Sequence, residues 1–164
     1  MNQGREVASR LRAAVADGVR WFAGVGEERA AQRPAGGGWT AREVVGHLID
    51  SACNNHRRFV INQDSPRLVV DPYEQDAWVS RGRYAESPAA ELVRLWSTYN
   101  LQIARVLEAI PDGVLNQARG PLADYRFSYI APPAGDYATL GYLADDYVAH
   151  IQHHLRQIAS SLLQ

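Results

Sequence analysis

Residues 40–60, TAREVVGHLIDSACNNHRRFV, contain both the start signal and the periodicity of a long helix. Thr40 and Glu43 form a capping box, in which the threonine hydroxyl accepts a backbone N–H and the carboxylate bonds back to the threonine N–H. Val44 and the apolar residues that follow it share one side of the helix when each residue advances by about 100°. The sequence therefore predicts a helix from Thr40 to about Asn62 that packs one face into a core.

Three further helices are predicted on either side of this one. Apolar residues at spacings of three and four predict an amphipathic helix over 3–23. Ser87, followed by a proline, is typical of a helix start and predicts a helix over 88–110. Thr139 can cap a last helix over 139–162.

The connections between the predicted helices are long and irregular. Residues 63–86 contain two prolines, and one short helix is expected around 73–80. Residues 111–138 contain four prolines and are expected to form a long loop, and the glycine-rich segment 24–39 should also be irregular. This pattern predicts an all-α fold, a four-helix bundle with long crossover connections, in a single domain over 1–164.

Composition excludes several functions. All 17 basic residues are arginine and the net charge is −1, so neither a lysine Schiff base nor a Walker-type phosphate loop is available. Nucleic acid is not an expected partner, because no basic stripe is present. Cys53 is the single cysteine, which excludes an internal disulfide and a cysteine-based zinc cluster. Without a long apolar run or a signal peptide, no membrane contact and a cytoplasmic location are expected.

A line of polar side chains is predicted along the helix that starts at Thr40. Its members are His47, Ser51, Asn54, Asn55 and Arg58, with Asn55 turned furthest toward the core. Buried polar side chains need partners, so this line indicates either a ligand cavity or hydrogen bonds between helices. His56 falls on the opposite side of the helix and cannot share a site with His47.

Three histidines lie close together in the stretch DDYVAHIQHHLRQI at 145–158. His150 and His154 stack one turn apart at the edge of the apolar face, whereas His153 points away from it. Two imidazoles at this spacing can bind one metal ion, although such a pair at the edge of a core is more often a pair of polar residues than of ligands. A metal site would need a third ligand, which His47 can supply.

Two segments together resemble the DinB-like superfamily of metal-binding four-helix bundles. They are GGWTAREVVGHLIDS at 37–51 and TLGYLADDYVAHIQHHLRQI at 139–158. The resemblance implies one divalent ion held by His47, His150 and His154. Members of this superfamily differ in activity: some are S-transferases or isomerases that use a low-molecular-weight thiol such as bacillithiol or mycothiol, others are called metal-dependent hydrolases, and many have no known reaction.

Three neutral imidazoles leave open positions on a metal ion, as in catalytic centres. A bound water could then become a nucleophile, or an external thiol could bind as thiolate. An external thiol would be required, because Cys53 falls on the wrong side of its helix. Zinc is the first choice of ion, and nickel, iron and copper also suit an all-imidazole site.

Two carboxylates lie near the predicted ligands. Asp146, one turn before His150, could orient that imidazole through a hydrogen bond. Asp50 could do the same for His47, but we expect Asp50 to be a solvated carboxylate on the helix surface. Tyr147 is expected in the core, and no residue is singled out as catalytic.

The leading hypothesis is a divalent-metal-dependent hydrolase or thiol S-transferase that acts on a small molecule. The alternative is a stress-related bundle protein that binds a metal or a small molecule without turnover. A third is a plain bundle with structural histidines. The resemblance also implies a homodimer.

Overall fold

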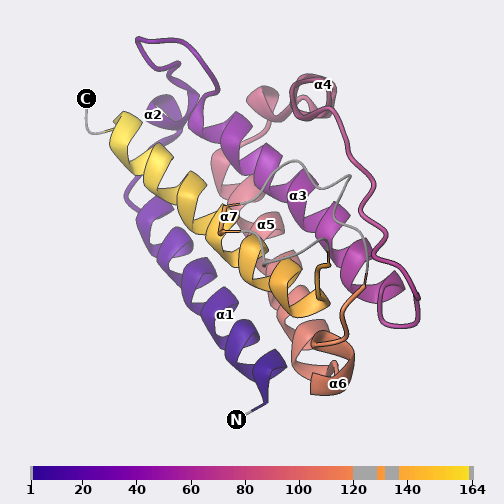
Figure 1. The fold of residues 1–164 in the computed structure, drawn as a ribbon. Helices are drawn as coiled ribbons and strands as arrows, with labels where there is room; N and C mark the ends of the chain where they lie inside the picture. Colours follow the sequence, from indigo (N-terminus) through magenta and orange to yellow (C-terminus); the bar gives the residue numbers. More distant parts are fainter. Residues whose placement is uncertain (1, 120–128, 132–136, 163–164) are drawn as a thin grey trace.

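Four long helices form the molecule, α1 (Gln3–Phe22), α3 (Ala41–Ile61), α5 (Ala89–Ala109) and α7 (Leu140–Leu162). The computed structural model describes residues 2–119, 129–131 and 137–162. α1 and α7 run in one direction, and α3 and α5 run in the other (Figure 1). Because α3 and α5 are parallel, the chain between them must return along the bundle. The predicted all-α four-helix bundle with long crossovers is confirmed.

Short helices interrupt the connections. They are α2 (Glu27–Ala31), α4 (Gln75–Gly82), the 3-10 helix η1 (Tyr84–Glu86) and α6 (Asp112–Leu115). α4 matches the short helix expected around 73–80, but α2 and α6 lie where irregular chain was expected. Helices of about one turn contain no apolar repeat that a sequence could reveal. The rest of the loop predicted over 111–138 falls partly outside the described residues.

The sequence signals for the starts of α3 and α7 are confirmed. The N–H of Glu43 donates to Thr40 Oγ1 over 3.2 Å, and the N–H of Thr40 donates to Glu43 Oε2 over 2.7 Å. Thr139 Oγ1 accepts the backbone N–H of Tyr142 over 3.0 Å. Local hydrogen bonds therefore define where both site-bearing helices begin.

The start of α5 differs from the prediction. Ser87 was expected to cap this helix, but the N-cap is Pro88, which has no side chain that can accept a hydrogen bond. The carboxylate of Glu27, on α2, instead accepts the N–H groups of Ala89 and Ala90 over 3.0 and 3.3 Å. A carboxylate is favourable at the positive end of a helix dipole, so a distant residue replaces the local cap.

The core lies between the four long helices and is mostly apolar. Trp96 on α5 is fully buried and packs against Gly18 on α1, where a Cβ atom would lie 2.7 Å from the indole ring. Tyr147 is buried, as predicted, and donates a hydrogen bond of 2.6 Å to the side chain of Asn100. The polar face of α3, which carries His47 and Ser51, lies toward α7.

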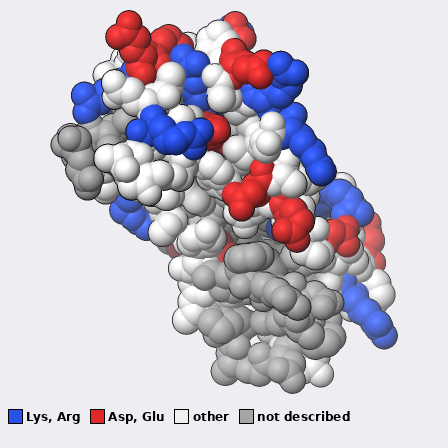
Figure 2. Space-filling model, turned by 90° about the horizontal axis from the view of Figure 1, so that it is seen from above, with Lys and Arg blue, Asp and Glu red and all other residues white. Residues whose placement is uncertain are grey.

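The surface is charged but mixed. On the face in Figure 2, basic and acidic side chains of the described residues alternate, and neither sign forms a continuous stripe. Among the described residues, no helix is long and apolar enough to cross a bilayer. In the described part, β-type backbone pairing is limited to an isolated antiparallel bridge between Arg119 and Ala138.

Candidate metal centre

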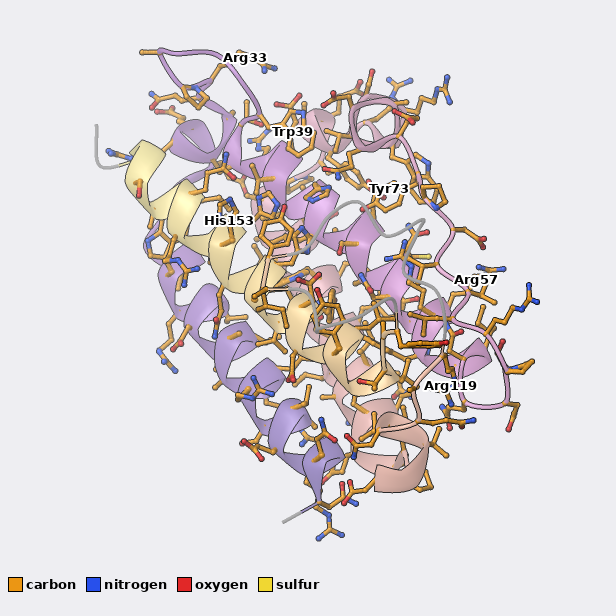
Figure 3. All side chains as sticks on the ribbon, in the orientation of Figure 1. Arg33, Trp39, Arg57, Tyr73, Arg119 and His153 are labelled. Carbon is orange, nitrogen blue, oxygen red and sulfur yellow. The ribbon has the colours of Figure 1, made fainter. Side chains whose placement is uncertain are left out.

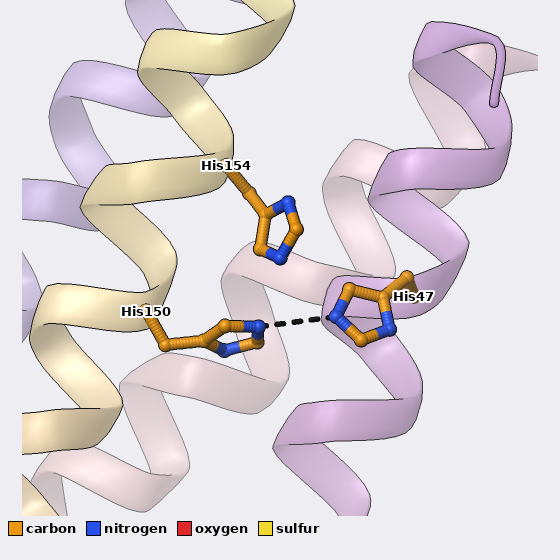
Figure 4. Close-up of side chains that lie close together, drawn as sticks. All are labelled: His47, His150 and His154. Carbon is orange, nitrogen blue, oxygen red and sulfur yellow. Dashed lines mark hydrogen bonds between the residues drawn. The ribbon is translucent and has the colours of Figure 1, made fainter. Parts of the chain in front are cut away.

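Three histidine side chains from two helices meet in the interior. His47 comes from α3, and His150 and His154 come from successive turns of α7 (Figure 4). All three are buried, and each offers a ring nitrogen within 4.8 Å of those of the other two. The Nε2 atoms of His47 and His150 are 3.0 Å apart. Residues separated by about a hundred positions therefore present their ring nitrogens to one small space.

Burial keeps these imidazoles neutral. Burial and, next, the charge that His154 would carry lower the pKa of His47 from 6.5 to about 3. Burial and the same neighbour hold the pKa of His150 well below its ordinary value. Burial also lowers the pKa of His154, against a hydrogen bond from its Nδ1 to Gln157 Oε1 that raises it. Neutral imidazole is the form that binds metal ions.

Hydrogen bonds account for some of the ring nitrogens and leave others without partners. Ser51 Oγ lies 3.2 Å from His150 Nδ1, and Gln157 Oε1 lies 2.9 Å from His154 Nδ1. His154 Nε2 and His47 Nδ1 are buried and have no hydrogen-bond partner among the described residues. A buried nitrogen without a partner is costly, and a cation between the rings would satisfy His154 Nε2.

The polar line predicted on α3 lies beside this cluster. Asn55 Nδ2 donates to the Ser51 carbonyl oxygen over 2.9 Å and to Ser51 Oγ over 3.2 Å. Arg58 donates to Asn55 Oδ1 over 3.4 Å, and Asn54 donates to the carbonyl of Asp50 over 2.9 Å. These hydrogen bonds of the two asparagines are made within α3, not between helices as the alternative reading supposed.

Asp146 holds a connection in place. Its Oδ1 accepts the backbone N–H groups of Tyr129 and Ile130, the latter over 3.0 Å. The ring of Tyr129 then lies 4.8 Å from that of His150, centroid to centroid. The group at His150 Nδ1 is the hydroxyl of Ser51, where sequence reasoning had offered the carboxylate of Asp146.

Asp50 is not the solvated carboxylate that was expected. It is buried, and the hydroxyl of Tyr84 donates to its Oδ1 over 2.5 Å. Burial raises the pKa of Asp50, and the hydrogen bond from Tyr84 lowers it. Tyr84 reaches this position because its ring lies directly on Gly46, where a Cβ atom would be 2.0 Å from the ring. The crossover, which helical periodicity does not describe, removes Asp50 from solvent.

Of the side chains set aside by the helical-wheel argument, His153 lies at the edge of the cluster, with its ring 5.3 Å from that of His154, whereas His56 and Cys53 lie elsewhere on α3. His153 is exposed on α7 (Figure 3). His56 Nδ1 lies 3.1 Å from the hydroxyl of Tyr99 on α5. Cys53 is exposed and is a free cysteine.

Aromatic rings that sequence reasoning did not place at the site surround the histidines. The Trp39 ring, just before α3, lies 5.1 Å from the His47 ring (Figure 3). Tyr129 contacts His150 and also His153, at 5.1 Å from the latter. The tryptophan precedes the capping threonine and could have been placed from the sequence, whereas nothing local marks Tyr129.

Comparisons with known proteins agree with this geometry. The sequence profile of the DinB superfamily matches residues 10–158. The chain is 27% identical over 158 residues to a Geobacillus thermodenitrificans protein, covering 95% of this chain and 78% of that one. It is also 27% identical over 123 residues to the Bacillus subtilis protein called "Putative metal-dependent hydrolase YfiT", covering 74% of this chain. The aligned region spans 63% of that relative's length.

The fold has a counterpart among solved structures. The structure of Bacillus subtilis YfiT, described as having an unusual four-helix bundle topology, superposes with a TM-score of 0.71 at 21% identity. The match covers 96% of this chain and 82% of that one. Because the family profile also spans most of the sequence, the chain belongs to the DinB superfamily.

Proposed function

We propose that this protein is a metal-dependent hydrolase whose divalent ion is held by His47, His150 and His154. One observation supports the proposal most directly: three buried, neutral imidazoles from two helices converge, and His154 Nε2 has no partner among the described residues. The name of the Bacillus subtilis relative points to the same chemistry.

The spacing of the nitrogens fits a metal ion. Zinc–nitrogen bonds of about 2.0–2.1 Å in a tetrahedral arrangement place two ligand nitrogens about 3.3 Å apart. His47 Nε2 and His150 Nε2 are 3.0 Å apart, and the three candidate ligand nitrogens all lie within 4.8 Å of one another. The value expected for zinc falls between these two distances. Three protein ligands leave at least one position open, which distinguishes catalytic from structural zinc sites.

Residues around the histidines would fix the orientation of the imidazole rings. An ion bound here supplies Lewis acidity and an open coordination position. Ser51 and Gln157 hold the Nδ1 atoms of His150 and His154, which leaves their Nε2 atoms directed inward. Trp39 and Tyr129 pack against the rings of His47 and His150, respectively.

Zinc is our first choice of ion, with nickel, iron and copper as alternatives for an all-imidazole site. We propose a small molecule as the substrate, because the centre lies inside the bundle. A low-molecular-weight thiol remains a proposed co-substrate, and it would have to come from outside since Cys53 is exposed away from the centre.

Metal content tests the ligand set. The chain would be stripped with a chelator, reloaded with zinc and analysed by inductively coupled plasma mass spectrometry. We expect His47→Ala and His154→Ala to lose at least about 100-fold in zinc affinity, since structural and catalytic zinc sites depend on every ligand. His56→Ala and His153→Ala are matched controls and should bind like the wild type. Equal zinc content in all four variants would refute the ligand set.

Turnover separates hydrolysis from the alternatives. The zinc-loaded chain would be assayed with p-nitrophenyl acetate and, in parallel, with bacillithiol plus an electrophilic aryl chloride. Zinc-dependent ester cleavage that His154→Ala abolishes is the expected result. Activity only in the thiol assay would favour the transferase, and none in either would favour a binding protein without turnover.

A further inference from the structure

The side chain of Asn55 lies between those of Ser51 and Arg58 on α3, and all three residues are buried. Its Nδ2 donates to the carbonyl oxygen of Ser51 over 2.9 Å and to Ser51 Oγ over 3.2 Å. Its Oδ1 accepts from Arg58 Nη1 over 3.4 Å. Because a carbonyl oxygen only accepts and a guanidinium only donates, these two neighbours fix the orientation of the amide. Asn55 therefore directs both of its side-chain N–H groups to Ser51.

These hydrogen bonds belong to a longer chain that ends at a candidate ligand. Arg58 Nη2 donates to the backbone carbonyl of Asp71 over 2.8 Å, on the first crossover, residues 62–88 between α3 and α5. At the other end, Ser51 Oγ lies 3.2 Å from His150 Nδ1 on α7. Hydrogen bonds in a buried environment are stronger than those in water, because the local dielectric constant is low. The chain thus connects the first crossover, through α3, to His150.

The three histidines differ in the partner of Nδ1. His154 Nδ1 lies 2.9 Å from Oε1 of Gln157, which is on the same helix and is exposed. His47 Nδ1 has no hydrogen-bond partner among the described residues. The partner of His150, in contrast, is buried and belongs to another helix. Of the three rings, that of His150 is therefore the one whose orientation depends on how α3 is packed.

The direction of the contact between Ser51 and His150 decides whether His150 can bind an ion through Nε2. That mode of binding requires a proton on Nδ1, which Ser51 Oγ must accept. Asn55 donates to one lone pair of the same oxygen and leaves the other for His150. Without Asn55, the hydroxyl can turn its own proton toward His150 Nδ1. It would then favour the other tautomer, in which Nε2 carries the proton and cannot bind an ion.

We propose that Asn55 is a positioning residue of the metal centre, which together with Arg58 holds Ser51 as the acceptor of the His150 Nδ1 proton. The inference rests on the proposed function and adds to it the residues that orient one ligand. It makes His150 the ligand that is oriented in advance, with the first crossover as the anchor. Partners of this kind contribute about 10- to 100-fold to metal affinity.

The first test measures the zinc affinity of the full chain in competition with a chromogenic chelator. Asn55→Leu roughly keeps the size of the side chain and removes its amide. Asn54→Leu is the matched control, because Asn54 also donates over 2.9 Å to the carbonyl four residues earlier, that of Asp50. Among the described residues, Asn54 makes no hydrogen bond with Ser51. Ser51→Ala, alone and combined with Asn55→Leu, tests whether the two residues act in one chain.

We expect Asn55→Leu to bind zinc at least about ten-fold more weakly than the wild type. Asn54→Leu should stay within about two-fold of the wild type, as a substitution that leaves the chain intact. In the Ser51→Ala chain, Asn55→Leu should cause no further loss, because the contact that it supports is already gone. Equal losses for the two asparagine variants, or losses that multiply in the double variant, would overturn the inference.

A second test needs no substitution. In the zinc-loaded wild type, labelled with isotope-enriched histidine, nuclear magnetic resonance measures how fast each Nδ1 proton exchanges with solvent. The proton of His150 should exchange at least about ten-fold more slowly than that of His154, because Ser51 is buried and Gln157 is exposed. Equal exchange of the two protons would contradict the inference and leave the metal centre intact, even if Asn55→Leu does not fold. A wild-type chain that binds no zinc would refute the proposed function and this inference together.

Discussion

The histidine cluster and the aromatic wall around it are built differently. The cluster is held by two long helices, with His150 and His154 one turn apart on α7 and His47 opposite them on α3. The wall comes from the connections, through Tyr84 on the first crossover, which covers Gly46 and Asp50, and through Tyr129 on the second, which contacts His150. Helices position side chains by a regular repeat, whereas a connection is positioned by a few specific contacts.

Those contacts come from helix residues beside the histidines. Gly46 and Asp50 hold Tyr84, and Asp146 holds the segment that carries Tyr129. Arg58 holds the carbonyl of Asp71. Helix residues next to the histidines therefore also hold the connections in place. Substitutions at these positions should affect the wall and the histidine cluster to different degrees.

The largest expected effect comes from Gly46→Ala. A Cβ atom there would lie 2.0 Å from the Tyr84 ring, so the crossover must move. We expect the free energy of unfolding to fall by about 3 kcal/mol, the upper range for overpacking. For a domain of this size, the melting temperature should drop by about 10 °C in differential scanning calorimetry.

Gly113→Ala is the control for Gly46→Ala, because no atom lies within 4 Å of the Cβ it would add. Its stability should stay within about 0.5 kcal/mol of the wild type. Combining Gly46→Ala with Tyr84→Ala should cost less than the sum of the single changes, since the clash partner is gone. Equal stability of the two glycine variants would show that Tyr84 does not depend on Gly46.

An intermediate effect is expected from acid acting on the cluster in the metal-free chain. The pKa of His47 is about 3 when folded, against 6.5 ordinarily. Between these values the unfolded chain binds the proton and the folded chain does not, so stability falls as pH falls. From about pH 7 to about pH 5, His47 should account for a loss of about 2 kcal/mol.

Urea denaturation in the presence of a chelator measures this loss at the two pH values. His47→Gln cannot take up the proton, so it should lose about 2 kcal/mol less than the wild type over the same interval. His56→Gln, changed on the opposite side of α3, should lose as much as the wild type. Identical losses in all three chains would mean that His47 is not held neutral by burial.

The smallest effect is expected from Tyr84→Phe, which keeps the ring on Gly46 and removes the donor to Asp50. The buried carboxylate then loses a hydrogen bond, at a cost of about 1 kcal/mol. Zinc affinity should change less than two-fold, because the histidines are held by the helices. Adding Asp50→Asn to Tyr84→Phe should recover part of the lost stability. A large drop in the zinc affinity of Tyr84→Phe would show that the wall and the histidine cluster are not independent.

Much of the fold could be predicted because its signals are local. The capping box at Thr40 and the cap at Thr139 depend on residues three positions apart. Helical periodicity then placed His47, His150 and His154 at the edges of two apolar faces and set His153 aside, and these are the placements observed. Ser87 failed as a cap because Glu27, sixty positions away, is the partner of the first N–H groups of α5.

The surroundings of the site could not be predicted from the same signals. Asp50 looked solvated on a helical wheel, which describes one helix and not the chain packed against it. The crossover covers that side through Tyr84. The choice of Ser51 over Asp146 beside His150 depends on how α3 and α7 face each other, and no repeat in either helix encodes it.

The sequence by itself determined where the long helices begin, which of their faces are apolar and which histidines lie at the edges of those faces. Each of these follows from interactions within a few residues. The tertiary structure alone decided that Tyr129 borders the cluster, that Asp50 is buried, and that His154 Nε2 has no partner among the described residues. Those outcomes depend on contacts between segments far apart in the chain, whose energies arise only when the bundle is assembled.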